Sequence, residues 1–172
     1  MSHKQILISF WLTLLTLSSS GQIDKPVDEP ESFTFLNPDN FLGDTLYIKG
    51  RFTECGEWGG HLELSKIYYK DNEFYFTYQK FFPDCSRTKE NNGEPPQTLN
   101  SFITKKLSGR EKSLIYKYCH QLLDAKFSEP APTHSGYIFE VRNKDGGMYI
   151  SVYTSDGIIR DEYQVFIAQL LK

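Results

Sequence analysis

Apolar and polar residues alternate in three stretches of the first half of the chain, at residues 45–55, 61–70 and 73–82. A period of two places successive side chains on opposite faces of a strand. Asp71-Asn72 separates the second stretch from the third, and these residue types tolerate the positive φ of a tight hairpin turn. The pattern predicts three consecutive strands, and residues 98–106 alternate in the same way and predict a fourth.

The alternation also sorts the side chains by face. In the second predicted strand, Leu62, Leu64 and Tyr68 share one face, and Glu63 and Ser65 share the other. The first predicted strand divides in the same manner, with one polar face turned toward solvent.

A different spacing marks two helices. Ser108 and Glu111 have the Ser-x-x-Glu form of a capping box. The apolar residues that follow recur at helical spacing as far as Lys126. This stripe consists of Leu114, Ile115, Tyr118, Cys119, Leu122 and Leu123. Residues 161–171 form the second predicted helix, with Asp161 and Glu162 in its first turn, where acidic side chains are favourable.

A second hairpin is predicted between the two helices. Apolar residues alternate with the charged Glu140 and Arg142 over residues 137–142, Asp145-Gly146-Gly147 turns the chain, and Met148, Ile150 and Val152 recur at a period of two. Asp156 is interpreted as a turn former. The element order predicts an α+β fold: an antiparallel sheet of five to six strands in two hairpin units, with two amphipathic helices on one face.

The N-terminal residues 1–21 have the features of a cleavable signal peptide. Lys4 supplies a positive charge, residues 6–17 form an apolar run, and small residues follow at the cleavage zone. A spanning helix needs roughly 20 apolar residues, more than this run contains. We expect an exported protein, in the periplasm or outside the cell, with no membrane span after signal removal.

The remaining chain divides into two parts. Residues 22–42 contain proline and acidic residues without periodicity and predict an irregular lead-in. Residues 43–172 are long enough for a single α+β domain with its own core.

Charge and missing motifs narrow the classes of function. The formal net charge is −3 and becomes −4 when Lys4 is lost, and the sequence contains no run of Lys or Arg. Nucleic acid and anionic membrane surfaces are therefore not expected partners. The chain has no Gly-rich phosphate loop, no His-Glu-x-x-His and no Gly-x-Ser-x-Gly, and no cofactor is predicted. The sequence leaves the oligomeric state open.

The three cysteines predict one disulfide and one free thiol, because an odd number in an exported chain leaves one unpaired. Cys119 lies in the apolar stripe of the first helix, where a free thiol acts as a small hydrophobe. Cys55 and Cys85 are then the expected pair. Their bridge closes a loop of about 30 residues, which stabilises the fold by about 3–4 kcal/mol in the chain-entropy account.

The connection from Cys55 to His61 combines a thiol, a carboxylate, an indole and an imidazole with three glycines. In the structural interpretation, the disulfide and the glycines hold a tight bend. Two chemical alternatives stay open, and both would make the protein a hydrolase. Cys55, His61 and Cys85 would bind zinc with Glu57 as fourth ligand or base, or Cys55 would be a nucleophile with His61 as its base.

Binding without catalysis is a further interpretation. Side chains with an apolar body and a polar tip are enriched at interfaces, although they also suit the solvent side of an aromatic-rich sheet. An aromatic ledge is expected from Trp58, Tyr47, Tyr69, Tyr75 and Tyr78. The predicted binding residues are Glu57, Trp58, His61 and Tyr69. The leading hypothesis is an exported, non-catalytic domain that binds a protein or a glycan, and the hydrolase is the alternative.

The layout resembles that of small exported bacterial α+β domains of uncharacterised activity. The matching residues are Cys55-Gly56 in a hairpin, Leu107-Ser108 with Glu111 at the helix start, Phe127 after that helix, and the closing helix from Tyr163 to Leu171. The similarity spans about two thirds of the chain, and its motifs are structural. It implies the fold class and export, and it implies no activity.

Overall fold

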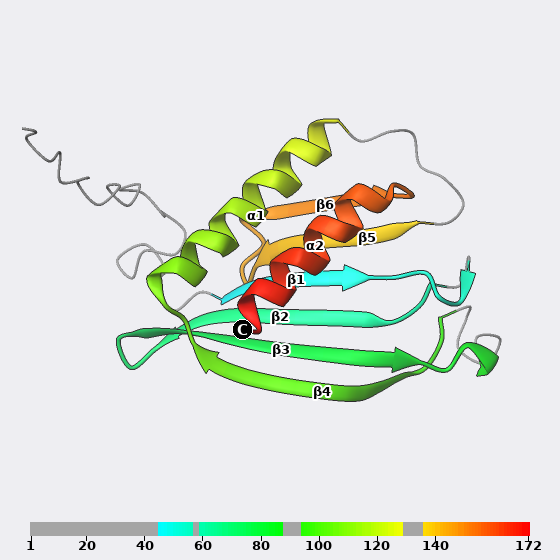
Figure 1. Cartoon of the computed structure of the whole chain (residues 1–172), viewed down its shortest axis with the longest axis horizontal. Coiled ribbons are helices and arrows are strands. Elements are labelled where there is room, and N and C mark those ends of the chain that lie inside the picture. Colours follow the sequence, from blue (N-terminus) through cyan, green and yellow to red (C-terminus); the bar gives the residue numbers. More distant parts are fainter. Residues whose placement is uncertain (1–44, 57–58, 88–93, 129–135) are drawn as a thin grey trace, which may run out of the picture. The chain divides into compact units, whose positions relative to one another are not determined.

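Six strands and two helices make up the part of the chain that the computed structural model describes, residues 45–56, 59–87, 94–128 and 136–172 (Figure 1). All of these residues belong to the unit Ser32–Lys172. The strands form one antiparallel sheet, so the predicted α+β class is confirmed. Neither of the two helices is long and apolar enough to cross a membrane.

The strands in chain order are β1 (Thr45–Arg51), β2 (Leu62–Lys70), β3 (Glu73–Pro83), β4 (Gln97–Lys106), β5 (Tyr137–Asn143) and β6 (Tyr149–Thr154). Their order in the sheet is β4-β3-β2-β1-β5-β6. The second hairpin therefore pairs with β1, at the far side of the sheet from β4. This arrangement places β1, at the centre, between β2, the next strand of the chain, and β5, which lies far away in the sequence.

The turns follow the sequence predictions. Asp71 and Asn72 adopt φ values of 51° and 63°, as the two-residue connection between β2 and β3 requires. Gly146, in the turn between β5 and β6, has a φ of 78°. The first strand ends at Arg51 rather than at residue 55, because the chain beyond it forms the loop whose base is closed by a hydrogen bond from Phe52 N to His61 O, 3.0 Å long.

One face of the sheet, which we call the core face, carries the buried side chains. Across β1, β2, β3 and β5 it is lined by Leu46, Ile48, Ile67, Phe76, Phe139 and Val141, which are at most 1% exposed. Residues directly opposite each other in paired strands share a face, as Ile48, Ser65 and Val141 do. The buried helix residues Ile115, Tyr118, Leu122, Tyr163, Phe166 and Leu170 belong to the same cluster.

Helix α1 (Gly109–Phe127) begins as the sequence predicts. Ser108 accepts a hydrogen bond from the backbone of Glu111, and the Glu111 side chain accepts one from the Ser108 backbone. The stripe is buried at Ile115, Tyr118, Cys119 and Leu122. Leu123, at the margin of the same stripe, is 37% exposed.

Helix α2 (Gly157–Leu170) begins at Gly157, not at Asp161. Asp156 is its N-cap, because Oδ1 of Asp156 accepts a hydrogen bond of 2.9 Å from Ile158 N. Ile158 is largely exposed, so the first turn does not continue the apolar stripe by which the helix was recognised. Figure 1 shows α2 crossing in front of β5, β1 and β2.

Gly50 explains how closely α2 approaches the sheet. A Cβ at this position would lie 2.8 Å from Cζ of Tyr163, closer than side-chain atoms pack. The Tyr163 ring contacts the Phe139 ring, with centroids 5.0 Å apart. The glycine on the core face of β1 therefore makes the space that a buried tyrosine of α2 fills.

Candidate functional site

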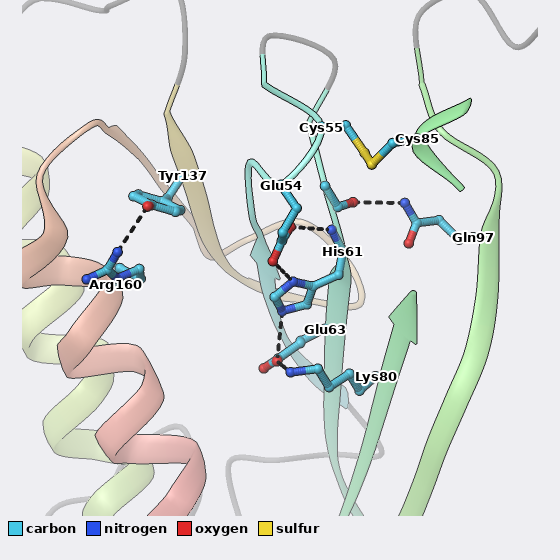
Figure 2. A network of polar contacts seen from close by, with 10 residues as sticks. Glu54, Cys55, His61, Glu63, Lys80, Cys85, Gln97, Tyr137 and Arg160 are labelled. Carbon is cyan, nitrogen blue, oxygen red and sulfur yellow. Dashed lines mark hydrogen bonds and ion pairs between the residues drawn. A yellow bond between two sulfur atoms is a disulfide. The ribbon is translucent and has the colours of Figure 1, made fainter. Parts of the chain in front are cut away.

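The loop between β1 and β2 is held at one end by a disulfide. Cys55 is bonded to Cys85, with their Cα atoms 5.3 Å apart, which confirms the predicted pair (Figure 2). The backbone of Cys55 donates to Gly59 O at 2.7 Å, and Gly56 and Gly59 have positive φ. Glu57 and Trp58, two of the predicted binding residues, lie outside the described residues.

Gly60 fixes the approach of this loop to the chain that leads into β4. Nε2 of Gln97 donates to the Gly60 carbonyl at 2.9 Å. A Cβ at residue 60 would lie 2.8 Å from Phe52 O and would also collide with Glu54. A disulfide thus attaches the loop to Cys85, and a side-chain hydrogen bond attaches it to Gln97, the first residue of β4.

His61 lies at the base of the loop between two carboxylates. Its Nδ1 contacts Oε1 of Glu54, and its Nε2 lies 3.1 Å from Oε1 of Glu63. The His61 backbone donates to Oε2 of Glu54 at 2.9 Å. Figure 2 shows the imidazole between the two acids, and its ring stacks on Phe52 with centroids 3.9 Å apart. His61 is 8% exposed, so it is a packed residue rather than an exposed contact.

Glu63 is a charged residue on the core face. It is 5% exposed, and Nζ of Lys80 lies 2.9 Å from its Oε1. Burial alone raises the pKa of Glu63, but hydrogen bonds from His61, Lys80 and Tyr78 and the charge of Lys80 outweigh burial and lower that pKa below its usual value. Burial, and next the charge of Glu63, raises the pKa of Tyr78. The charges of this network are matched inside the fold.

This geometry does not suit catalysis by the predicted residues. Both ring nitrogens of His61 already contact a carboxylate of the same chain, Glu54 at Nδ1 and Glu63 at Nε2, so neither is open to a substrate. The Cys55 sulfur is bonded to Cys85 and is unavailable as a nucleophile or a metal ligand. Among the described residues, no group of three or more His, Cys, Asp or Glu side chains is placed to hold a metal ion.

A hollow of about 340 Å³ lies beside His61, with Tyr137 and Arg160 among its lining residues. Arg160 donates to the Tyr137 hydroxyl at 3.2 Å, and its NH2 lies 2.8 Å from Oδ1 of Asp161. The guanidinium that borders this hollow is therefore already paired with partners of its own chain.

The face opposite the core face, which we call the outer face, carries the second group of candidate residues. Its register places side chains in rows that run across the sheet. One row holds Arg142 on β5, Tyr47 on β1 and Lys66 on β2, each directly opposite the next. The neighbouring row consists of Glu140, Lys49, Leu64, Gln79 and Phe102, from β5 to β4.

A hollow of about 430 Å³ lies over these rows. Its lining includes the aromatic rings of Tyr47, Tyr68 and Phe102, the cations of Lys49, Lys66 and Arg142, and the polar groups of Thr77 and Gln79. This volume lies within the range of about 300–1,000 Å³ that is typical of ligand pockets. Phe102 is 58% exposed, so an aromatic ring is presented at the β4 side.

Cations and rings are organised in pairs on this face. The Arg142 guanidinium lies 5.5 Å from the centroid of the Tyr47 ring, and Nζ of Lys66 lies 5.0 Å from that of Tyr68. Tyr68 stacks on Tyr75 with centroids 5.7 Å apart. The rings of Tyr47, Tyr68 and Tyr75 therefore each contact another side chain of the same face.

A smaller hollow, of about 110 Å³, continues the outer face toward the disulfide-held loop. It shares Lys49 with the larger hollow, and Gly60, Glu94 and Gln97 are among its lining residues. Arg51 NH1 pairs with Glu94 here at 3.1 Å. The loop is therefore continuous with the outer face, whereas His61 is turned toward the core face.

The predicted aromatic ledge is only partly present. Tyr47 and Tyr75 lie on the outer face, as predicted for one ledge. Tyr69 and Tyr78 belong to the core face, because they alternate with those positions along the strands, and placing them on the same ledge was wrong. Tyr78 is buried, and Tyr69 is packed against the core.

Lys66, Arg142 and Phe102 line the larger hollow but were not predicted as candidate site residues. Lys66 and Arg142 alternate with core residues in their own strands, so the outer position of these two was readable from the sequence. The proximity of the three residues was not readable, because it depends on β5 pairing with β1 and on β4 closing the opposite edge.

A third hollow, of about 380 Å³, lies between α1 and α2. Lys117, Val165 and Phe166 are among its lining residues. Val165 is 56% exposed. This groove is the alternative contact surface that an experiment must separate from the outer face.

No protein-family model matches the sequence, and no curated protein is similar enough to be counted as a relative.

Proposed function

We propose that the protein is an exported, non-catalytic domain that binds a protein or a glycan through the outer face of its sheet, with the loop from Gly56 to His61 at the rim of the contact surface. The observation that carries this proposal is the 430 Å³ hollow with its oriented rings and charges. Interfaces are enriched in Tyr and Arg, the residue types that line it.

The loop supports the proposal through its position. Its residue Gly60 borders the smaller hollow that adjoins the larger one through Lys49. The disulfide between Cys55 and Cys85 reduces the freedom of this rim. A rim of fixed shape lowers the entropy cost of binding, because less chain is ordered when the ligand arrives.

Export is part of the proposal. The disulfide fits an oxidising compartment. The N-terminal residues carry the charge, apolar run and small-residue zone of a cleavable signal. An oxidising location outside the cytoplasm is consistent with a ligand of the cell surface or of the surrounding medium.

The hydrolase alternative has less support from the geometry. It was centred on Cys55, Glu57 and His61, and the described part of this set consists of an oxidised thiol and an imidazole engaged on both nitrogens. Binding requires no such group to be free. The geometry of the outer face therefore supports ligand binding better than the geometry of the loop supports hydrolysis.

The experiment that tests the proposal compares two aromatic truncations. The purified protein is screened by biolayer interferometry against a panel of soluble glycans and extracellular proteins. For any ligand found, Tyr47→Ala should weaken binding at least about tenfold, since a tenfold change needs only about 1.4 kcal/mol. Phe127→Ala, which removes an 83% exposed ring at the end of α1, is the matched control and should bind as the unaltered protein does.

The opposite pattern contradicts the proposal. If Tyr47→Ala leaves the affinity unchanged and Val165→Lys, in the groove between α1 and α2, abolishes it, the outer face is not the contact surface. Thermal unfolding of each variant confirms that a loss of binding is not a loss of folding.

A further inference from the structure

We infer that the ligand of the outer face is a carboxylate-bearing polysaccharide, a chain of sugar rings that includes uronic acids. This inference rests on the proposed binding function of the same face and names the chemical class of its ligand. Three features carry it: two cations without acidic partners, an aromatic ring between them, and hydrogen-bonding side chains beside that ring.

The cations are the first feature. On the outer face, Lys49 is matched by Glu140, whose Oε2 lies 3.0 Å away, and the other carboxylate oxygen of Glu140 accepts from the Tyr149 hydroxyl at 3.0 Å. Lys66 and Arg142 form no ion pair with any residue that the structure describes. Elsewhere in the described chain, partly buried cations such as Lys80 and Lys105 each meet a glutamate.

The balance of charge in the hollow follows from this difference. Three cations and one acid line it, in a protein whose formal net charge is −3. Positive groups that line a concave surface attract anions and raise their local concentration. Carboxylates are the complementary groups that Lys66 and Arg142 lack within the chain.

The spacing of these groups is the second feature. Arg142, Tyr47 and Lys66 are directly opposite one another on three adjacent strands. Strands lie about 4.8 Å apart, so the backbone positions of Arg142 and Lys66 are roughly 10 Å apart, with Tyr47 between them in the row. A uronic-acid chain presents the matching pattern, because its carboxylates are separated by sugar rings whose C–H faces can lie on a tyrosine.

The polar groups beside the row are the third feature, and they suit the hydroxyl groups of a sugar. Thr77 and Gln79 lie in the floor of the hollow, and the amide of Gln79 both donates and accepts hydrogen bonds. Sugar hydroxyls need partners of both kinds. An acidic peptide such as polyglutamate would also meet the cations, but it has no sugar-ring C–H face to lie on the Tyr47 ring.

The experiment uses three soluble probes with the whole protein. Polygalacturonate carries carboxylates on sugar rings, dextran carries sugar rings without charge, and polyglutamate carries carboxylates without sugar rings. Isothermal titration at low salt should show binding of polygalacturonate, with polyglutamate and dextran each at least about tenfold weaker. Binding of polygalacturonate should also weaken as salt rises, because the cations are accessible to solvent.

Two charge-removing variants locate the site. The double variant Lys66→Gln/Arg142→Gln should bind polygalacturonate at least about tenfold more weakly. Arg110→Gln/Lys117→Gln removes the same charge from exposed positions of α1 and should bind as the unaltered protein does. A heparin arm separates recognition of sulfate from recognition of carboxylate. If the site does not prefer carboxylate, the protein will bind heparin more tightly than polygalacturonate.

The outcomes divide as follows. Absence of polygalacturonate binding, equal binding of polyglutamate, tighter binding of heparin, or equal losses in the two double variants each overturn the uronic-acid assignment. If that assignment fails while a protein or neutral glycan from the panel still depends on Tyr47, the proposed binding function stands. If Tyr47→Ala and Lys66→Gln/Arg142→Gln alter no interaction, the proposed function fails as well.

Discussion

The two faces of the sheet differ in whether their charged side chains have partners of opposite charge within the chain. On the core face, Glu63 is buried, but it is paired with Lys80 and hydrogen-bonded by His61 and Tyr78. On the outer face, Lys66 and Arg142 lie over tyrosine rings and have no carboxylate partner among the described residues. Matched charges are what a fold needs for its own stability, whereas unmatched ones are available to a partner.

This difference indicates which residues of the protein are available to contact a ligand. The residues with the most chemical character in the sequence, Cys55 and His61, are fully engaged inside the fold. The residues that the fold leaves available are ordinary strand lysines, arginines and tyrosines. Changes on the core face should therefore affect stability, and changes on the outer face should affect binding.

The largest expected effect comes from a pair of phenylalanine truncations. Phe76→Ala, at a fully buried position on the core face, should lower the free energy of unfolding by about 3–5 kcal/mol. Phe102→Ala, at a mostly exposed position on the outer face, should cost less than about 1 kcal/mol. Urea denaturation measures both. Similar losses in the two variants would show that the outer face is covered as the core face is.

The disulfide comes next in size. Replacing both Cys55 and Cys85 by serine should lower the free energy of unfolding by about 3–4 kcal/mol, because the bridge restricts the unfolded chain over a separation of 30 residues. Reduction of the unaltered protein should give the same loss in a urea titration. Cys119→Ser serves as the comparison under reducing and non-reducing conditions. If reduction changes nothing, the loop is held by the Gln97–Gly60 contact alone.

The buried charge network should give the core face a pH dependence. The pKa of Glu63 is lowered by folding, so its contribution to stability is present above the ordinary glutamate pKa of about 4.3 and is lost as pH falls below it toward the folded pKa. Between pH 3 and pH 6, the free energy of unfolding should depend less steeply on pH in Glu63→Gln than in the unaltered protein. Glu111 also has a lowered pKa, so Glu111→Gln is the control that shows how much of the slope comes from the helix cap.

The smallest effect is a reactivity rather than an energy. Burial raises the pKa of the Cys119 thiol to about 12, so the native protein should not react with iodoacetamide at neutral pH. Mass spectrometry should find one alkylated cysteine only after unfolding without reductant. Rapid labelling of the native protein would mean that the core around α1 opens readily and that burial does not protect Cys119.

Much of the local structure was determined by the sequence. Alternation predicted the strands because a pleated chain repeats every two residues, and the Ser108–Glu111 pair predicted the start of α1 because it satisfies backbone groups at a helix end. The Cys55–Cys85 pair followed from an odd cysteine count and one buried thiol. Each of these inferences depends on short segments or on exclusion within a small set.

The tertiary structure determined which face of each strand is buried and which residues meet on the outer face. The alternation in β2 separated Leu64 from Glu63, but only the pairing with β3, which brings Lys80 to Glu63, makes burial of the acidic side possible. The outer row joins Arg142 to Lys66 because β5 enters the sheet beside β1, a pairing that no local pattern contains. Partners that are distant in the sequence meet only through the strand order, so the candidate binding surface came from the fold and not from any motif.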